Sequence, residues 1–151
     1  MRRLLASTNG GFLVSKIKQV QGRVFGKLLG QHGFSQFSGA QGRILFVLWR
    51  HDSISISELS DKTGLAKTTL TSMLDRLEAL GCIKRVSDSA DRRKVNIALT
   101  KAAQNLKSRY DEVSVRMNEI FYAGFSDHEM QNFENLLARV LKNLTEREKM
   151  K

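Results

Sequence analysis

The side chains best suited to chemistry in this sequence are hydroxyls and cations that gather in two groups. The first group combines small hydroxyls with two cations: Lys67, Thr68, Thr69, Thr71, Ser72 and Arg76. The second group is a continuous charged run: Asp91, Arg92, Arg93 and Lys94. Hydroxyl and guanidinium groups donate hydrogen bonds to base edges and phosphate oxygens, so both groups favour contacts with duplex DNA.

The other reactive side chains form no pattern typical of an enzyme or a metal site. His32, His51 and His128 are scattered, and none stands at metal-ligand spacing from another ligand type. The sequence also lacks a glycine-rich phosphate loop and a nucleophile elbow. Asp88 and Asp91 are close in sequence, but pairing with arginine explains them better than catalysis does. We therefore expect a protein that is not an enzyme and needs no metal or other cofactor.

Two short helices are predicted to position the first group. Ser55 and Glu58 stand at capping-box spacing, and Gly64 suits the left-handed position that ends a helix. A second helix is predicted from about Lys67 to Leu80, because apolar residues recur there at steps of three and four. This apolar stripe consists of Leu70, Met73, Leu74, Leu77 and Leu80.

The opposite side of the second helix is polar. It carries Thr68, Ser72 and Asp75, flanked by Thr69, Thr71 and Arg76. Such a face is also typical of any helix side that faces solvent. It is rich in Thr and Ser, however, which are weaker helix formers than Glu and Lys. That composition favours a recognition helix whose first turns contact base edges.

A basic hairpin is predicted to position the second group. Gly81 ends the second helix, and β-branched strands follow at Ile83–Val86 and Val95–Leu99. In the second strand, inward residues alternate with outward ones: Val95, Ile97 and Leu99 with Asn96 and Ala98. Charged residues on a hairpin are also typical of solvated strand edges. Lys84 and Arg85 raise the charge of this hairpin further, which favours contact with phosphates or a minor groove.

A known family shares the spacing of many of these residues. The shared positions are Leu59, Leu65, Lys67, Leu70, Thr71, Asp75, Arg76, Leu77, Glu78, Gly81, Arg85, Asp91, Arg93, Leu99 and Thr100. The segment therefore resembles the winged helix-turn-helix of the multiple antibiotic resistance regulator family, MarR. The run Asp91-Arg92-Arg93 is similar to the Asp-x-Arg motif of the family's wing. Ala40-Gln41 with Leu45 and Leu48 is similar to the family's second helix, and the resemblance spans about Phe12 to Leu144.

The chain departs from the family pattern at two positions. Ala66 stands where a Ser or Asp cap is common, so the recognition helix is expected to start less firmly or with a threonine cap. Ala103 stands where Gly is frequent, a change that costs nothing inside a helix.

The resemblance and the helical pattern together predict a mainly α (α+β) fold. They imply one MarR-type domain over residues 1–151, with a winged helix-turn-helix at 38–99 that ends in a two-stranded β-hairpin wing. Helices at 12–37 and 100–148 are expected to form a dimerisation lobe. Its contact residues are expected to be Ile17, Val20, Phe133, Leu137, Val140, Leu141 and Leu144. From the apolar stripes alone, an intramolecular helical bundle fits equally well, and the resemblance favours the dimer.

Caps and periodicity also place the N-terminal helices. The first ten residues are expected to be a loose arm before a helix at Phe12–Gly30. Ser38 and Gln41 stand at capping-box spacing before the next helix. That helix turns Ile44, Leu45 and Leu48 toward the core, with Trp49 in the core or over it.

The C-terminal helices follow from the same signals. Thr100 is expected to cap one long helix that runs to about Gly124. Ser126 and Glu129 form another capping-box pair before the last helix, whose apolar face is wider than one neighbour covers.

The composition suits a small cytoplasmic protein with an anionic partner. The 151 residues carry a net charge of +10, which favours nucleic acid first and a membrane surface second. No run approaches the ~20 apolar residues of a membrane span, and the apolar run after Arg3 ends too early for a signal peptide. A single cysteine excludes an internal disulfide. We expect no membrane partner.

The patterns and the resemblance lead to one favoured function. We expect a transcription regulator that binds an inverted-repeat operator in double-stranded DNA as a homodimer. The resemblance implies a repressor that is released by a small lipophilic or phenolic effector, or by an oxidant. In the wing, Asp91 is expected to hold Arg93 in a minor groove through a bidentate pair.

Two alternatives remain open. One is a winged-helix adaptor that binds a protein or ligand without an operator, although an adaptor has no need of three adjacent cations at 92–94. The other is a redox-responsive regulator that uses Cys82, whose pKa Lys84 and Arg85 would lower if the thiol were exposed. We expect Cys82 to be a small packed residue, because redox cysteines of the family lie in the first helix and this chain has none there.

Overall fold

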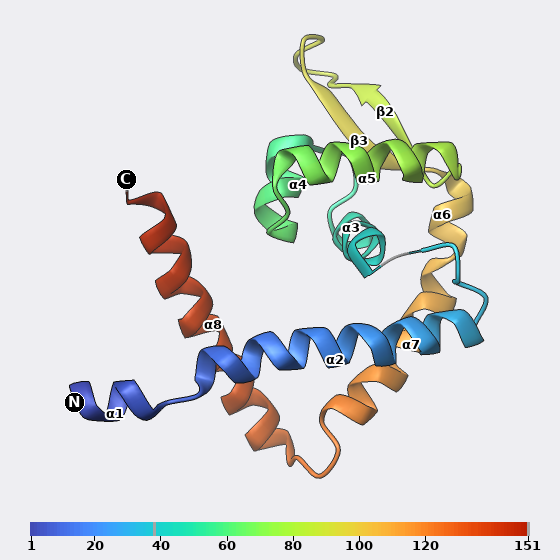
Figure 1. The fold of residues 1–151 in the computed structure, drawn as a ribbon. Coiled ribbons are helices and arrows are strands. Elements are labelled where there is room, and N and C mark those ends of the chain that lie inside the picture. Colours follow the sequence, from blue (N-terminus) through green and yellow to red (C-terminus); the bar gives the residue numbers. More distant parts are fainter. Residues whose placement is uncertain (38, 151) are drawn as a thin grey trace. The chain divides into compact units, whose positions relative to one another are not determined.

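The computed structural model describes residues 1–37 and 39–150, which belong to two compact units, Met1–Ser114 and Val115–Lys151. Its helices are α1 (Arg2–Ser7), α2 (Gly10–Gln31), α3 (Gly39–Arg50), α4 (Ile56–Thr63), α5 (Lys67–Ala79), α6 (Lys101–Asn105), α7 (Lys107–Phe121) and α8 (Asp127–Lys149) (Figure 1). Its strands are β1 (Ile54–Ser55), β2 (Ile83–Ser87) and β3 (Val95–Leu99). The mainly α fold class is confirmed, whereas the predicted capping role of Ser38 lies outside the described residues.

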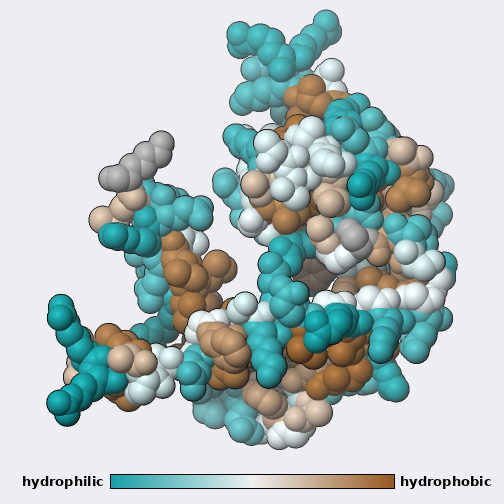
Figure 2. All heavy atoms as spheres, in the orientation of Figure 1, coloured by the Kyte–Doolittle hydropathy of each residue, from teal (hydrophilic) through white to brown (hydrophobic). Residues whose placement is uncertain are grey.

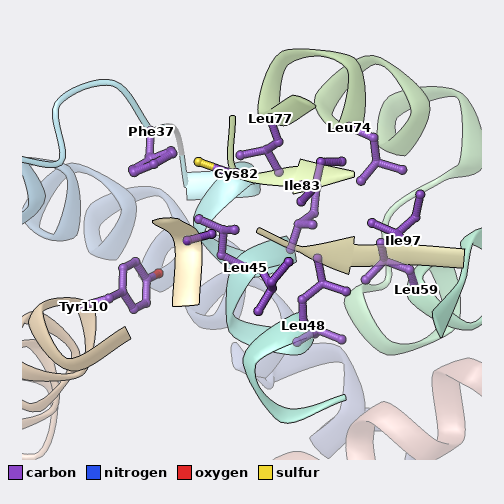
Figure 3. Packing of buried hydrophobic residues seen from close by; sticks show 14 of the residues in the cluster. Phe37, Leu45, Leu48, Leu59, Leu74, Leu77, Cys82, Ile83, Ile97 and Tyr110 are labelled. Carbon is purple, nitrogen blue, oxygen red and sulfur yellow. The ribbon is translucent and has the colours of Figure 1, made fainter. Parts of the chain in front are cut away.

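The core of the first unit forms around α3. Ile44, Leu45 and Leu48 of this helix are fully buried, as predicted. They pack with apolar side chains that α4, α5 and the sheet direct inward (Figure 3): Leu59, Leu70, Leu74, Leu77, Ile83 and Ile97. Burial of one such side chain stabilises a fold by roughly 1.5–3 kcal/mol, so this core holds α5 with its polar side outward.

The hairpin belongs to a three-stranded antiparallel sheet, where the sequence predicted two strands. The strand order is β1-β3-β2, and Ile54 of β1 pairs with Ile97 of β3. Because α3, α4 and α6 all pack against the central strand β3, its residues Ile97, Ala98 and Leu99 are all buried. The predicted alternation is therefore wrong: Ala98 is covered, while Val95 at the outer end of β3 is exposed.

The chain begins with a helix, so the expected loose arm is wrong. α1 is held by local hydrogen bonds such as that from the Leu5 amide to the Met1 carbonyl at 3.0 Å, and none of its residues is buried. Its Arg, Leu and Ala residues are strong helix formers, although propensity alone sustains a helix of six residues only marginally. The next helix, α2, starts at Gly10 rather than Phe12, and its one fully buried residue is Leu29.

The loop after α2 supplies two core aromatics that no periodic pattern marks. Phe34 and Phe37 are buried, and Phe34 makes an edge contact with Tyr110 of α7, with ring centroids 5.9 Å apart. Tyr110 also contacts Phe25 of α2 and Trp49 of α3. This aromatic cluster fixes the loop against three helices of the first unit.

The helix that follows the wing is interrupted, where the sequence predicts one continuous helix. Thr100 caps its start as expected, because the Thr100 hydroxyl accepts a hydrogen bond from the Ala103 amide at 3.2 Å. The Ala103 carbonyl accepts from the indole of half-buried Trp49 at 3.0 Å and from the Leu106 amide at 3.2 Å. With this carbonyl occupied by an indole and by an amide three residues on, α6 ends and α7 begins anew.

In the second unit, a short turn joins the end of α7 to α8. Gly124 has a φ of 85°, a left-handed conformation that glycine adopts without strain. Ser126 and Glu129 form both hydrogen bonds of the predicted capping box, at 3.1 and 3.0 Å. Four aromatic residues pack around the turn: Phe121, Tyr122, Phe125 and Phe133. No described residue of α8 is buried, and Figure 2 shows apolar surface exposed along this helix.

Candidate nucleic-acid interface

The turn between α4 and α5 is set by local hydrogen bonds. The Ser55 hydroxyl accepts from the Glu58 amide at 3.2 Å, which is one of the two bonds of the predicted capping box. Gly64 takes the left-handed conformation after α4, with a φ of 73°, as predicted. The Ser60 hydroxyl donates to the carbonyl of half-buried Leu65 at 2.7 Å. These contacts fix the angle at which α5 leaves the turn.

Helix α5, which the sequence predicts to be the recognition helix, carries the predicted apolar stripe over most of its length. Leu70, Leu74 and Leu77 are fully buried, and Met73 packs against the same core. Leu80 is 48% exposed, because it is the residue that follows the last helical turn, so the stripe ends one turn earlier than predicted. Ala66 precedes the first residue of the helix and supplies no side-chain cap. This agrees with the expectation for an alanine where the family commonly has a Ser or Asp cap.

All six residues predicted to contact DNA from this helix are exposed: Lys67, Thr68, Thr69, Thr71, Ser72 and Arg76. The Thr71 hydroxyl donates to the Lys67 carbonyl at 2.8 Å. The side chains of Thr68, Thr69 and Ser72 form no hydrogen bond within residues 1–37 and 39–150. Three hydroxyls on the face opposite the core are therefore free to meet a partner.

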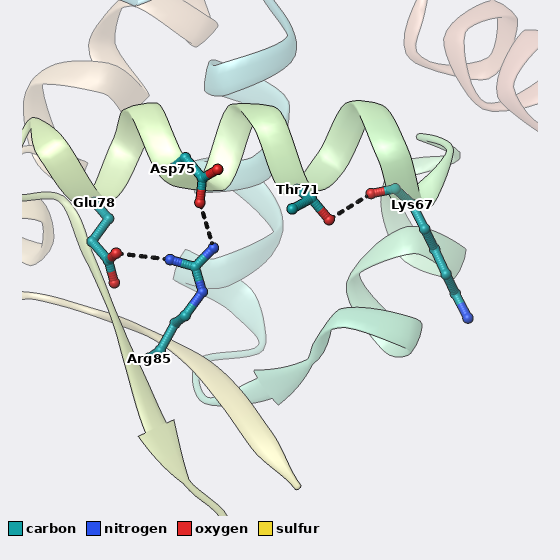
Figure 4. A network of polar contacts seen from close by, with 5 residues as sticks. All are labelled: Lys67, Thr71, Asp75, Glu78 and Arg85. Carbon is teal, nitrogen blue, oxygen red and sulfur yellow. Dashed lines mark hydrogen bonds and ion pairs between the residues drawn. The ribbon is translucent and has the colours of Figure 1, made fainter.

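Arg85 does not add to the charge of the wing, contrary to the prediction. Its guanidinium donates to a carboxylate oxygen of Asp75 and to one of Glu78, each at 2.8 Å (Figure 4). Asp75, predicted on the polar face beside the base-contacting residues, is thus engaged with β2. The fork geometry of arginine suits two acceptors one helical turn apart. The pair of contacts ties the first wing strand to the recognition helix.

The tip of the wing is built on Asp88. One of its carboxylate oxygens accepts from the amides of Ala90 and Asp91, at 2.7 and 3.3 Å, and the other accepts from the Asn96 side chain at 3.3 Å. These hydrogen bonds, led by that from the Ala90 amide, lower the pKa of Asp88. Pairing of Asp88 with arginine is therefore wrong: this carboxylate organises the backbone of the loop.

Asp91 holds Arg93, but through one oxygen. That oxygen accepts from the Arg93 amide at 3.0 Å and from its Nε at 3.2 Å, so the expected bidentate pair is wrong. Because Asp91 is only two residues before Arg93, its carboxylate reaches the Nε of the guanidinium. The two terminal nitrogens of the guanidinium point away from Asp91. The Arg93 side chain is 91% exposed, and Arg92 and Lys94 are exposed beside it. The wing therefore presents a guanidinium whose outer donors are unoccupied.

Arg76 lies on the other flank of α5, beside an open pocket of about 530 Å³. The pocket is formed by the loop after α2, the start of α3 and the end of α5, and its lining residues are Ser35, Gln36, Phe37, Gln41, Arg76, Ala79 and Leu80. An aromatic ring, a cation and small polar groups are the features that bind a small anionic or phenolic molecule. Arg76 can therefore serve DNA or a pocket ligand.

The positive charge of the chain is not concentrated on the winged helix-turn-helix. Residues 1–51 contain eight Lys and Arg residues and no Asp or Glu. Residues 52–99 contain eight Lys and Arg residues and seven Asp and Glu residues. The net charge of the whole chain thus does not itself locate a DNA contact at the predicted interface. What marks this interface is local arrangement: its acidic residues are turned to Arg85 or to the wing backbone, and cations remain at the tip.

Cys82 is a packed residue, as predicted. It is 5% exposed, belongs to the core and forms no disulfide. Burial raises the pKa of its thiol, which reduces the reactive thiolate. The neighbouring cations on β2 therefore do not activate it.

The residues predicted to form a dimer contact lie on helix surfaces. Ile17 and Val20 are exposed on α2, and Phe133 is half-buried in the aromatic cluster of the second unit. The remaining four are exposed on α8: Leu137, Val140, Leu141 and Leu144. Their role in a dimer stays a prediction.

Two other kinds of site find no support in residues 1–37 and 39–150. No three His, Cys, Asp or Glu side chains there lie together in a way that would hold a metal ion. No helix there is both long enough and apolar enough to cross a membrane.

Comparison with known proteins points to one family. The model of the MarR family matches residues 37–95. The HTH-type transcriptional regulator TtmR of Methylorubrum extorquens is 35% identical over 100 residues, which cover 66% of this chain and 50% of TtmR. This chain thus spans about half the length of that curated relative. The uncharacterized HTH-type transcriptional regulator YsmB of Bacillus subtilis is 30% identical over 119 residues, which cover 76% of this chain and 80% of YsmB.

The fold agrees with a solved structure of the same kind. A crystal structure of a mutant MarR from E. coli, complexed with operator DNA, aligns with a TM-score of 0.76 at 24% identity. The alignment covers 87% of this chain and 92% of that chain. A likeness of this size supports the winged-helix architecture of the first unit.

Proposed function

Because this chain belongs to the MarR family, we propose that it is a transcription regulator that binds a specific DNA sequence through α5 and the wing. The observation that carries this proposal is the pairing pattern of the first unit. Its acidic side chains near the interface are paired with other groups of the same unit, whereas the Arg93 guanidinium and three hydroxyls of α5 face outward.

The dimensions of α5 suit a major groove. Its 13 residues span about 20 Å at 1.5 Å per residue, enough for one crossing of the groove. Thr68, Thr69 and Ser72 supply donors to base edges, and Lys67 supplies a phosphate contact at the start of the helix. The wing tip extends the contact, with Arg93 in a minor groove and Arg92 and Lys94 at phosphates.

A homodimer on an inverted repeat completes the proposal. A single module of this kind buries roughly 600–1,000 Å² on DNA, so two modules placed ~34–36 Å apart give a specific site. The exposed apolar residues of α8 in the second unit, and Ile17 and Val20 in the first, each supply apolar surface for pairing. Because a regulator must reach chromosomal DNA, the proposal includes a cytoplasmic location. The proposed function is binding alone, without catalytic activity.

The proposal extends to repression relieved by an effector. The pocket beside Arg76 offers a cation and an aromatic ring at the end of α5, and a small lipophilic or phenolic molecule with an acidic group fits that chemistry. Such a molecule acts as an effector only if it binds the DNA-free arrangement more tightly than the DNA-bound one.

A gel shift with the DNA upstream of the protein's own gene tests the function. We expect a specific complex that resists excess unrelated DNA and weakens with salt. Equal affinity for all duplexes, or none, would contradict sequence-specific regulation and favour a winged-helix adaptor.

A further inference from the structure

We propose that Thr71 recognises a thymine through methyl–methyl contact and that its hydroxyl takes no part in base recognition. This inference rests on the proposed DNA-binding function and assigns one of its specificity determinants. The residue lies at the exposed surface of α5, on the side nearest the wing, between Lys67 and Asp75 (Figure 4).

The hydroxyl of Thr71 is already engaged within the helix. Its Oγ1 donates to the Lys67 carbonyl at 2.8 Å, and Figure 4 shows the bond running along the helix toward Lys67. A threonine hydroxyl carries one proton, so this contact leaves no donor for a base. The group that Thr71 directs away from this bond is its γ-methyl.

The neighbouring hydroxyls differ in this respect. Thr68, Thr69 and Ser72 have side chains without hydrogen bonds in the described part of the chain, so each keeps its proton for a partner. One turn further along the helix, the Asp75 carboxylate accepts a hydrogen bond from Arg85 of β2 at 2.8 Å. This carboxylate is therefore occupied and turned to β2. Among these residues, Thr71 is the one whose hydroxyl proton is already used inside the helix, so its methyl is the group left to meet a base.

The donor and acceptor pattern of the major groove then selects the base. Guanine presents acceptors alone, which a side chain without a donor cannot satisfy. Adenine and cytosine present an amino donor, and the Thr71 oxygen keeps lone pairs that accept from such a donor, so Thr71→Val below tests that alternative against the methyl contact. Thymine presents a 5-methyl group, and the threonine methyl is one of the groups that contact it.

Uracil substitution tests this contact, because uracil lacks only the 5-methyl group. The probe is a duplex selected from a randomised pool by repeated binding to the full chain. Each thymine of one half-site is replaced in turn by uracil. For the wild-type protein we expect one position at which the substitution weakens binding about fourfold, the effect of removing one buried methyl group.

Three variants, each checked for folding by circular dichroism, assign that effect to Thr71. Thr71→Ser keeps the hydroxyl but lacks the methyl, so it should bind the thymine and uracil duplexes equally. Thr71→Val keeps a methyl but lacks the hydroxyl, so it should retain the fourfold preference. Thr69→Ser makes the same change on the opposite flank of α5 and should retain the preference at that thymine.

The possible outcomes distinguish a failure of the Thr71 inference from a failure of the proposed DNA-binding function. A wild-type protein for which every uracil substitution is silent overturns the inference, and so does a Thr71→Ser variant that keeps the full preference. Loss of the preference in Thr71→Val would show that the hydroxyl is needed, and overturns it too. A protein that selects no duplex at all overturns the proposed function itself, and the inference with it.

Discussion

Arg85 of β2 donates to the carboxylate of Asp75 in α5 at 2.8 Å, and its other terminal nitrogen reaches Glu78 at the same distance. The three side chains are partly exposed, so the contacts contribute modestly to stability, about 0.2–1 kcal/mol each. Their geometric effect is larger. They link α5 to the first strand of the wing, and so fix the distance between the two elements that we propose to contact DNA.

Replacing Arg85 tests this link. Arg85→Met should lower the free energy of unfolding by roughly 0.5–2 kcal/mol. It should also weaken binding to the selected duplex, because α5 and the wing then adopt the DNA-bound spacing at an entropic cost. Denaturant unfolding and a gel shift measure the two effects. Lys84→Met removes a neighbouring cation that forms no ion pair in residues 1–37 and 39–150, and serves as the control. Equal effects of both changes would show that only charge matters.

Arg93 is expected to contribute to DNA affinity without contributing to the fold. Its side chain is 91% exposed and paired with a single oxygen of Asp91. Arg93→Ala should weaken specific binding by about 1–3 kcal/mol and leave the unfolding midpoint unchanged. Arg116→Ala is a matched control, because Arg116 is an exposed arginine of α7 that also pairs with one acidic residue, Glu119. Wild-type affinity in the Arg93 variant would remove the wing from the interface.

Cys82 should react slowly with thiol reagents in the native protein. Burial raises the pKa of this thiol above its usual value, so less thiolate is present at pH 7–8 than for a free cysteine. We expect labelling by iodoacetamide to be far slower than in denaturant, and mild peroxide to leave DNA binding unchanged. Fast native labelling together with loss of binding in peroxide would instead support a redox-responsive regulator.

Gly42 of α3 allows the close approach of Tyr110. A Cβ at Gly42 would lie 2.6 Å from the Tyr110 hydroxyl oxygen, and burial raises the pKa of Tyr110 to about 12, so this group stays neutral. Gly42→Ala should lower stability by about 1–3 kcal/mol through overpacking. Gly39→Ala, in the same helix with no atom within 4 Å of the added methyl, should not.

The clash at Gly42 has a direct second test. Adding Tyr110→Phe to Gly42→Ala removes the clashing oxygen and should restore most of the lost stability. If the double variant is as unstable as Gly42→Ala alone, the clash is not the cause. Thermal unfolding of the wild-type protein, the two single variants Gly42→Ala and Tyr110→Phe, and the double variant provides the comparison.

Local signals predicted much of this molecule because they act over three or four residues. The capping box at Ser126 and the glycine turn at Gly64 are of this kind. Two of the errors came from contacts between distant segments. The Trp49 indole occupies the Ala103 carbonyl and interrupts a helix whose periodicity continues through the break. At the interface, charge alone placed Arg85 on the DNA side, and only the fold brings two carboxylates within its reach.

The last prediction concerns the apolar face of α8. Leu137, Val140, Leu141 and Leu144 recur at steps of three and four, and their exposed fractions run from 36% to 65%. Monomeric proteins rarely expose a contiguous apolar face of this kind, and a second copy can cover it through an isologous contact. Two aspartates placed there would be buried at the contact, where an unpaired charge is strongly unfavourable.

Leu137→Asp combined with Leu141→Asp should therefore give monomers in sedimentation and abolish tight binding to the selected duplex. Gln131→Asp with Asn135→Asp places the same charges at the same spacing on the opposite side of α8, and this variant should remain dimeric and bind normally. Circular dichroism checks that both variants fold. A folded Leu137 and Leu141 variant that stays dimeric would place the contact elsewhere on the chain. A folded monomer that still binds the duplex tightly would show that pairing is not a condition of DNA binding.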